Sequence, residues 1–460
     1  MKQIHFIGIG GSGLSAIAGL LVEMGFTVTG SDCADTSFLP HLRAAGVTIQ
    51  VGHRPENIRG ADVVVRSSAI PDDNPEVVAA HLAGIPVLKR ADFLGELMAG
   101  KTGIAVAGTH GKTTTTAMLA WVLYSLKQDP SFIIGGMSNN FGVNAHVGKG
   151  KHFVIEADEY DRMFLGLKPV VEVVTNIEHD HPDYYPTPED FKAAFVEFLK
   201  LLPVNGILIA CVEDRGSNAL ISEAKQLGMQ ALGYGISKKS KLIDNQSYVK
   251  TRKGNEKGGF MFEAIVNGQS TIVDLAVPGD HNVRNALATL TVVSVLGLPV
   301  ADAAKALSEF SGTGRRFDVL GEVNGITIIN DYAHHPTEIR ATLAAARLKY
   351  ANRRIWVVWQ PHTYSRTQAL FSEFARAFPN ADEVIVTEIF PAREPKQDYS
   401  AEKVFRAMSH RAAHFIPALP DVSNYLVSNL CPSDVLLVLS AGDADTVSKD
   451  VLEKLENLNK

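Results

Sequence analysis

The sequence has few cysteines and no long apolar run. Its three cysteines, Cys33, Cys211 and Cys431, are far apart and lack metal-binding spacing, which argues against a disulfide framework and favours a reducing compartment. No apolar stretch reaches the roughly 18 residues that a membrane-spanning helix needs. The first residues run into a glycine-rich turn instead of a secretory signal. We therefore expect a cytoplasmic protein without a membrane partner.

An excess of positive charge is also missing. The chain carries 44 Lys and Arg against 50 Asp and Glu, a net charge of -6. No basic field would therefore attract a nucleic acid, and we expect no nucleic-acid partner. Apolar residues make up 46% of the 460 residues, which is ordinary for a folded α/β protein longer than one domain.

Short apolar runs alternate with helical patterns along the chain, which predicts an α/β fold of three domains. The predicted strands of the first domain are residues 4–7, 27–30 and 63–66. Those of the second are residues 103–107, 153–155, 170–174 and 206–210, and residues 237–277 have the shorter alternation of an antiparallel appendage. Those of the third are residues 325–330, 355–360, 383–387 and 434–440. We place the domains at residues 1–99, 100–312 and 313–460.

The first glycine-rich turn, G-I-G-G-S-G, follows the first predicted strand. Its glycines allow a tight turn and the close approach of a diphosphate to a helix N-terminus. Asp32 follows the second strand, where an acid can bind a ribose. The same pattern suits NAD, any other nucleotide diphosphate or a purely structural turn, so it does not name the ligand.

The second glycine-rich turn, G-T-H-G-K-T-T at residues 108–114, lies between a predicted strand and a helix. Its amide groups can face phosphate oxygens, Lys112 would neutralise them, and Thr113 would bind magnesium. The turn is two residues shorter than the standard Walker loop. We interpret it as a variant phosphate-binding loop.

Acidic and histidine-rich stretches follow the next two strands, E-A-D-E from Glu156 and N-I-E-H-D-H up to His181. The carboxyl ends of parallel strands share the ligand edge of an open sheet, so these groups could reach a metal on the phosphates. A solvated acidic loop is the alternative.

Further polar groups occur at the start of an Ala-rich helix and at strand ends of the third domain. Asn282 and Asn285 could bind an adenine edge or merely cap their helix. The groups of the third domain suggest a site for a second substrate that faces the nucleotide. They are Arg316, Asp331, Tyr332, His334, His362 and Arg366.

In this order, the motifs closely resemble those of the Mur ligase family, and the resemblance covers almost the whole chain. The segments that carry it are residues 8–15, 67–70, 107–115, 156–161, 176–181, 281–285, 314–317, 331–338 and 360–367.

The resemblance implies a Rossmann-like N-terminal domain for a UDP-sugar, a central P-loop ATPase domain with a parallel-sheet core, and a C-terminal Rossmann-like domain for an amino acid. It further implies that ATP, with Mg²⁺ or Mn²⁺, phosphorylates the lactyl carboxylate of UDP-N-acetylmuramate. L-alanine then attacks the acyl phosphate to form an amide. We expect a monomer or a homodimer.

Roles for single residues follow from the same likeness. Lys112, Glu156, His181 and Arg316 would act in catalysis, and Thr113, Glu156 and His181 would bind metal. ATP would contact Gly108, Thr109, Gly111, Lys112, Thr113, Thr114, Asn282, Asn285, Arg316 and Asp331. The UDP-sugar would contact Gly8, Gly10, Ser12, Gly13, Asp32, Ser67 and Ser68. The amino acid would contact Tyr332, His334, His362 and Arg366.

Three alternatives remain at this point. A recycling ligase of the same family attaches a ready-made tripeptide to the same UDP-sugar. A nicotinamide-dependent dehydrogenase is suggested by the first glycine turn but leaves the second unexplained. A non-catalytic nucleotide-binding regulator leaves Glu156 and His181 unexplained. Thr363 stands where alanine-adding enzymes often have Arg, so the resemblance assigns no anion contact to this position.

Overall fold

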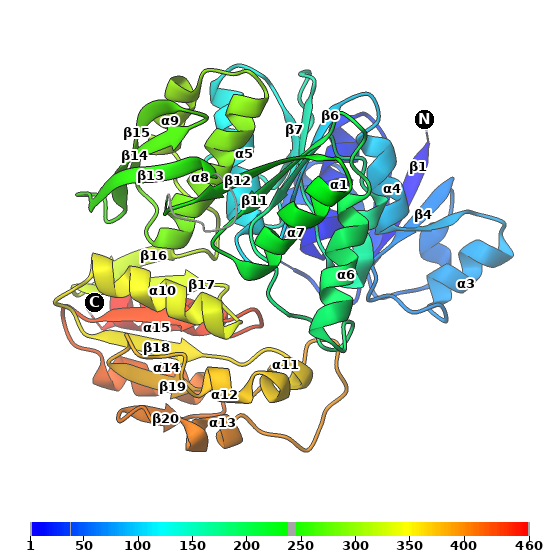
Figure 1. Cartoon of the computed structure of the whole chain (residues 1–460). Coiled ribbons are helices and arrows are strands. Elements are labelled where there is room, and N and C mark those ends of the chain that lie inside the picture. Colours follow the sequence, from blue (N-terminus) through cyan, green and yellow to red (C-terminus); the bar gives the residue numbers. More distant parts are fainter. Residues whose placement is uncertain (1, 37, 238–244, 459–460) are drawn as a thin grey trace.

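The computed structural model describes residues 2–36, 38–237 and 245–458, which form three sheets covered by helices (Figure 1). The first sheet, in blue, is entirely parallel with the order β3-β2-β1-β4-β5. Its strands are β1 (Gln3–Ile7), β2 (Thr27–Asp32), β3 (Thr48–Val51), β4 (Val63–Arg66) and β5 (Val87–Lys89). Its helices are α1 (Ser12–Glu23), α2 (Leu39–Ala44), α3 (Pro75–Leu82) and α4 (Arg90–Leu97), with a short 3₁₀ helix η1 (Pro55–Ile58).

The central sheet has the order β15-β14-β13-β12-β11-β10-β6-β9-β7-β8, with a parallel core from β12 to β7. Its strands are β6 (Thr102–Ala107), β7 (Ser131–Ile133), β8 (Ala145–His146), β9 (His152–Glu156), β10 (Val171–Val174), β11 (Ile207–Cys211), β12 (Gln230–Gly235), β13 (Asn245–Gly254), β14 (Phe260–Val266) and β15 (Gln269–Leu275). Its helices are α5 (Lys112–Ser125), η2 (Tyr160–Gly166), α6 (Pro188–Leu199), α7 (Arg215–Gln226), α8 (Asp280–Val295) and α9 (Val300–Ser308).

The third sheet has the order β16-β17-β21-β18-β19-β20, in which β16 is antiparallel to β17 and the other neighbouring strands are parallel. Its strands are β16 (Asp318–Val323), β17 (Ile326–Asp331), β18 (Ile355–Trp359), β19 (Glu383–Val386), β20 (Ala413–Phe415) and β21 (Val435–Leu439). Its helices are α10 (Pro336–Lys349), α11 (Tyr364–Ala369), α12 (Phe371–Phe374), α13 (Glu402–Ala407), α14 (Leu419–Asn429) and α15 (Asp445–Asn457). In Figure 1 this unit lies below the central sheet, with α10 in yellow on the side that faces it.

The predicted strands occur in all three sheets, and the pairing of β13, β14 and β15 confirms the antiparallel appendage. Residues 238–244 of the predicted appendage lie outside the described part. Several strands escaped prediction, and β3 and β16 show why. Both are largely exposed or half-buried, so they lack the continuous apolar run that marked the buried strands.

Apolar side chains of each sheet are buried under the helices. Strands made almost entirely of apolar residues, such as β6 and β21, are buried along nearly their whole length. Burial on both faces is what a parallel sheet covered by helices requires. Among the described residues, no helix combines the length and apolar character needed to cross a membrane.

Candidate active site

The second glycine turn joins β6 to α5, and two of its glycines have backbone angles that favour glycine. Gly108 has φ +130°, and a Cβ there would lie 2.1 Å from the Thr175 hydroxyl oxygen. Gly111 has φ +83°, and a Cβ there would lie 2.9 Å from Asn285 Oδ1. Larger residues would therefore strain the backbone and push away neighbouring polar groups. The turn leaves amide groups at the N-terminus of α5, the arrangement that binds phosphate.

Lys112, the first residue of α5, is held by acceptors inside the turn. Its Nζ donates to the carbonyl oxygens of Gly108 at 2.6 Å and Thr109 at 3.2 Å, and to Glu159 Oε1 at 2.9 Å. Burial alone would lower the pKa of Lys112, but the carboxylates around it, Glu159 first, raise it above its ordinary value. Lys112 is therefore a buried cation surrounded by anionic groups.

Glu156 lies at the end of β9 and faces the start of α5. Its Oε1 accepts from the Thr113 hydroxyl at 3.0 Å and its Oε2 from the Gly135 amide at 2.6 Å. Burial raises the pKa of Glu156, although Lys112 opposes the shift. A hydroxyl and a carboxylate are oxygen ligands suited to magnesium, so Thr113 and Glu156 fit the predicted metal.

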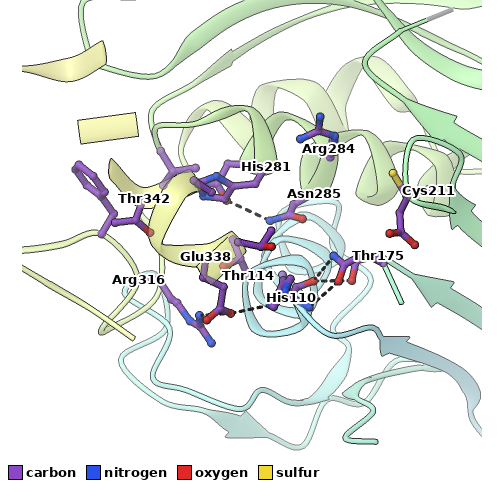
Figure 2. A pocket seen from close by; sticks show the side chains of 18 of the residues that line it. His110, Thr114, Thr175, Cys211, His281, Arg284, Asn285, Arg316, Glu338 and Thr342 are labelled. Atoms are coloured by element: carbon purple, nitrogen blue, oxygen red, sulfur yellow. Dashed lines mark hydrogen bonds and ion pairs between the residues drawn. The ribbon is translucent and has the colours of Figure 1, made fainter. Parts of the chain in front are cut away.

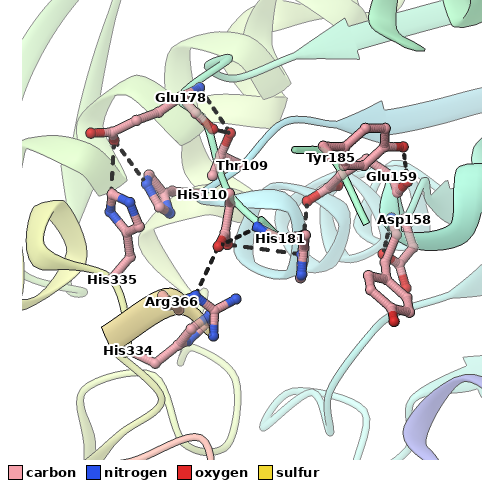
Figure 3. Close-up of polar contacts among 12 residues, drawn as sticks. Thr109, His110, Asp158, Glu159, Glu178, His181, Tyr185, His334, His335 and Arg366 are labelled. Atoms are coloured by element: carbon pink, nitrogen blue, oxygen red, sulfur yellow. Dashed lines mark hydrogen bonds and ion pairs between the residues drawn. The ribbon is translucent and has the colours of Figure 1, made fainter. Parts of the chain in front are cut away.

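His181 follows β10 and has φ +54°. Its Nε2 lies 3.7 Å from Glu159 Oε1 and 3.8 Å from Asp180 Oδ2, and its buried Nδ1 has no hydrogen-bond partner in the part of the chain that the structure describes. An unpaired buried nitrogen is a group that a ligand can satisfy. The structure thus brings His181 to Glu159, and through Glu159 to Lys112 (Figure 3).

A cavity of about 310 Å³ opens beside the turn, between the central and third sheets (Figure 2). This volume is in the range of small-molecule sites. Six of the residues predicted to bind ATP line it, namely Gly111, Thr114, Asn282, Asn285, Arg316 and Asp331. Sequence reasoning did not select several others, among them Thr175, Cys211, Tyr234, His281, Arg284 and Glu338.

The two asparagines of α8 do not cap it, because the N-cap is Gly279. Asn282 donates to the Pro278 carbonyl at 2.7 Å and accepts from Asn285 Nδ2 at 3.2 Å. Asn285 lies so close to Gly111 that its Oδ1 leaves no room for a side chain there. This pair therefore joins α8 to the phosphate turn at the wall of the cavity.

The cavity wall from the third sheet is organised by Asp331, at the end of β17. Its carboxylate accepts from the Phe317 amide at 2.7 Å, the Ala333 amide at 2.8 Å and the Thr342 hydroxyl at 3.2 Å. The guanidinium of Arg316 lies 3.7 Å from Glu338 Oε1 and 5.0 Å from the centre of the Tyr332 ring. Two backbone amides thus fix Asp331 in place.

The predicted amino-acid residues form one connected group, and Arg366 is at its centre. Arg366 is 2% exposed, and its Nε donates to Asp180 Oδ1 at 2.8 Å, across from the third sheet to the central one (Figure 3). Its Nη1 lies 2.9 Å from His362 Nδ1, and the His362 and His334 rings are 5.8 Å apart. Tyr332 contacts His334 at a ring distance of 5.2 Å.

Burial dominates the electrostatics of this group. It lowers the pKa of His334 to about 3 and that of His362 to about 2, with Arg366 adding to both shifts. Although burial opposes it, Arg366 holds the pKa of Asp180 well below its ordinary value. Near neutral pH the site therefore contains neutral imidazoles beside a buried ion pair.

The first glycine turn is shaped by Asp32. Its Oδ2 accepts from the Gly10 amide at 2.7 Å, so this carboxylate braces the turn itself. Gly8 has φ +83°, and a Cβ there would lie 3.0 Å from Ser67 Cβ. Ser68 donates to the Met163 sulfur at 3.7 Å. Ser12 begins α1, and its side chain lies outside the described part.

Arg90 connects the first glycine turn to the central site, which the sequence did not indicate. A Cβ on Gly13 would lie 1.8 Å from Arg90 Nη1, and Arg90 Nη2 donates to Asp158 Oδ2 at 3.3 Å. Arg90 starts α4, a helix without an obvious motif. Only its proximity in the folded chain to the first glycine turn and to Asp158 reveals it.

Three family models match consecutive parts of the chain. The Mur ligase family, catalytic domain, matches residues 3–102; the Mur ligase middle domain matches residues 106–293; and the Mur ligase, glutamate ligase domain, matches residues 315–442. Together they span most of the three sheets.

Relatives match along the whole length. The UDP-N-acetylmuramate--L-alanine ligase of Syntrophus aciditrophicus is 40% identical over 100% of this chain and 94% of its own length. The enzyme of that name from Geobacter sp. strain M21 is 42% identical over 99% and 98%. Among solved structures, the UDP-N-acetylmuramate-alanine ligase of Thermotoga maritima is 30% identical with a TM-score of 0.83 and covers 100% of both chains. A murein peptide ligase of Psychrobacter arcticus is 26% identical with a TM-score of 0.76 and covers 99% of both.

Proposed function

The chain belongs to the Mur ligase family, and on that premise we propose that it joins L-alanine to the lactyl carboxylate of UDP-N-acetylmuramate with conversion of ATP to ADP and phosphate. This is a step of peptidoglycan precursor synthesis. The observation that carries the proposal is a contact between the third and central domains. Arg366 of α11 binds Asp180, which follows β10 beside the phosphate turn.

The assignment of the domains follows from the same proposal. Residues 1–99 bind the UDP-sugar, residues 100–312 bind ATP, and residues 313–460 bind the amino acid. Asn282 and Asn285 contact the base, and Asp331 approaches the nucleotide from the third domain. Tyr332, His334, His362 and Arg366 form the amino-acid side, within contact distance of one another.

The reaction needs positioning and charge neutralisation more than a covalent nucleophile, because ATP itself activates the acid. Lys112 and Arg316 bind the γ-phosphoryl group as it moves to the lactyl carboxylate. The incoming amine must be unprotonated to attack the acyl phosphate. The His334 and His362 imidazoles beside it are also neutral, which is consistent with such a site.

Magnesium belongs to the proposal as well. Thr113 and Glu156 would hold it on ATP, and Glu156 with His181 would hold a second ion near the carboxylate. A bound divalent cation would supply charge neutralisation between the phosphates and that carboxylate. The oxygen donors of Thr113 and Glu156 and the unpartnered His181 Nδ1 support this set.

The alternatives receive less support. The alanine ligase of T. maritima has the higher TM-score and identity of the two solved relatives, which favours alanine over a tripeptide as the amine. A dehydrogenase function does not explain the phosphate turn or the buried Lys112 within it. We further propose a cytoplasmic location and a monomer or homodimer.

Phosphate release tests the proposal. Purified protein is supplied with ATP, Mg²⁺ and UDP-N-acetylmuramate, and L-alanine, the tripeptide L-Ala-γ-D-Glu-meso-diaminopimelate or no amine is added in parallel. We expect release that requires L-alanine. Release that requires the tripeptide would make the chain a recycling ligase, and no release with either amine would refute both ligase functions.

A further inference from the structure

A second group of potential metal ligands is distinct from Thr113, Glu156 and His181. His110 of the phosphate turn, Glu178 after β10 and His335 before α10 each offer one ligand atom, and these atoms lie within 4.8 Å of one another. In Figure 3, dashed lines join the Glu178 carboxylate to both imidazoles. Two of the residues belong to the central domain and the third to the C-terminal domain.

We propose that His110, Glu178 and His335 form a binding site for a zinc-like transition-metal ion that links the phosphate turn to the third domain. Two imidazoles and a carboxylate are a donor set that zinc uses, whereas magnesium prefers oxygen ligands alone. Zinc bonds of about 2.0–2.2 Å place tetrahedral ligand atoms roughly 3.3 Å apart. Two of the observed separations between their ligand atoms, 3.0 Å and 3.9 Å, lie on either side of that value.

The partners of His110 match those of a metal-binding histidine. Its Nε2 lies 3.0 Å from Glu178 Oε2, and its Nδ1 lies 3.1 Å from Glu338 Oε1. Metal-binding histidines commonly donate their other nitrogen to a carboxylate, which fixes the ring and its tautomer. Glu338 provides that contact, and a metal ion would replace the proton between His110 Nε2 and Glu178.

Glu178 is oriented in the same way, since its Oε1 accepts from the Thr337 hydroxyl at 2.9 Å. The other carboxylate oxygen, Oε2, therefore points toward both imidazoles. It lies 3.0 Å from His110 Nε2 and 3.9 Å from His335 Nδ1. One carboxylate oxygen therefore already faces the centre of the group.

His335 supplies an independent observation. The residue is 2% exposed, and its Nε2 has no hydrogen-bond partner among the described residues. Its Nδ1, which lies 3.9 Å from Glu178 Oε2, accepts a long bond from the Thr337 amide at 3.3 Å. An ion bound at Nδ1 would replace this long bond with a stronger interaction and so offset part of the cost of burying the imidazole. Its ring centre is 4.7 Å from that of His110.

The start of α10 explains why these groups meet. His335 is the N-cap, and its amide donates to Glu338 Oε2 at 3.3 Å in a capping box. The segment from His335 to Glu338 thus presents an imidazole, a hydroxyl and a carboxylate on one helical turn toward the phosphate turn. An ion here would hold α10 against His110 and restrict movement of the third domain.

Cobalt binding tests the site without relying on the ligase reaction. Untagged, chelator-treated protein in excess Mg²⁺ is titrated with Co²⁺, whose visible absorption is strong in tetrahedral sites, and Zn²⁺ is then added as a competitor. We expect each chain to bind one Co²⁺ ion with an intense visible absorption band. Added Zn²⁺ should displace the Co²⁺ and abolish the band. His335→Asn keeps a good N-cap residue and should weaken binding at least about tenfold, while Glu338→Gln should weaken it about 10- to 100-fold through His110.

Two further variants separate this site from others. His181→Ala removes the histidine of the proposed magnesium pair, and His414→Asn removes a half-exposed histidine of β20. Both should keep the cobalt band. The proposal is overturned if His335→Asn and Glu178→Gln, folded by circular dichroism, bind Co²⁺ as wild type does, or if His181→Ala alone abolishes the band.

Discussion

The ammonium group of Lys112 lies 2.9 Å from Glu159 Oε1, in the turn that would receive the phosphates of ATP. Its other two bonds go to the carbonyl oxygens of Gly108 and Thr109, so all three donors are used within the protein. Lys112 must therefore exchange at least one acceptor when a phosphate binds. Of the three acceptors, Glu159 is the only anion, and it competes with the phosphate for the Lys112 ammonium group.

Replacing Glu159 with Gln should tighten ATP binding. The change removes a buried negative charge near the phosphates and leaves Lys112 a neutral acceptor. We expect the Kd of a non-hydrolysable ATP analogue with Mg²⁺ to fall at least about fivefold, roughly 1 kcal/mol, the energy of two unit charges 4 Å apart in water. Calorimetric titration measures it. Weaker binding by the folded variant would mean that Glu159 supports the phosphate site.

Replacing Lys112 with Met should lower turnover at least about 100-fold, the loss typical when one preorganised donor to a developing charge is removed. Phosphate release under saturating substrates measures this effect. Lys127→Met is the matched control, because Lys127 is an exposed lysine just beyond the other end of α5. Near-normal turnover by Lys112→Met would remove Lys112 from the phosphoryl-transfer step.

Much of this site could be predicted because polar residues follow buried parallel strands. β10, β6 and β9 are neighbours in the sheet, so the phosphate turn, Glu156 and the segment to His181 had to share one edge. The partner of each side chain could not be predicted. Asp180 and Arg366 are distant in sequence, and Arg90 reaches Asp158 from a helix without a motif, so only tertiary packing reveals these pairs.

Arg366 has a structural partner as well as its proposed role with alanine. Arg366→Ala leaves the buried Asp180 carboxylate unpaired, which should destabilise the protein by about 3–5 kcal/mol. Arg366→Met combined with Asp180→Asn removes both charges and should recover most of that loss in a denaturant titration. The KM for L-alanine should stay raised in the double variant. A KM that returns to wild type would assign the alanine carboxylate to another residue.

The alkylation rate of the Cys211 thiol should show whether ATP occupies the cavity, because this thiol lies in the cavity wall. It ends β11, lines the cavity and is 2% exposed, and burial raises its pKa to about 11. Compared with the ordinary value of 9.0, this shift leaves about 100-fold less reactive thiolate near neutral pH.

Iodoacetamide labelling followed by peptide mass spectrometry measures the reaction, with the exposed Cys431 as the internal reference. At pH 8, Cys431 should react first. Because the pKa of Cys211 lies above the accessible range, its rate should keep rising, about tenfold per pH unit, from about pH 7.5 to 9.5. ATP should slow Cys211 without affecting Cys431. Equal rates for the two thiols without ATP would contradict the burial of Cys211, and a lack of protection by ATP would show that the nucleotide does not occupy the cavity beside Cys211.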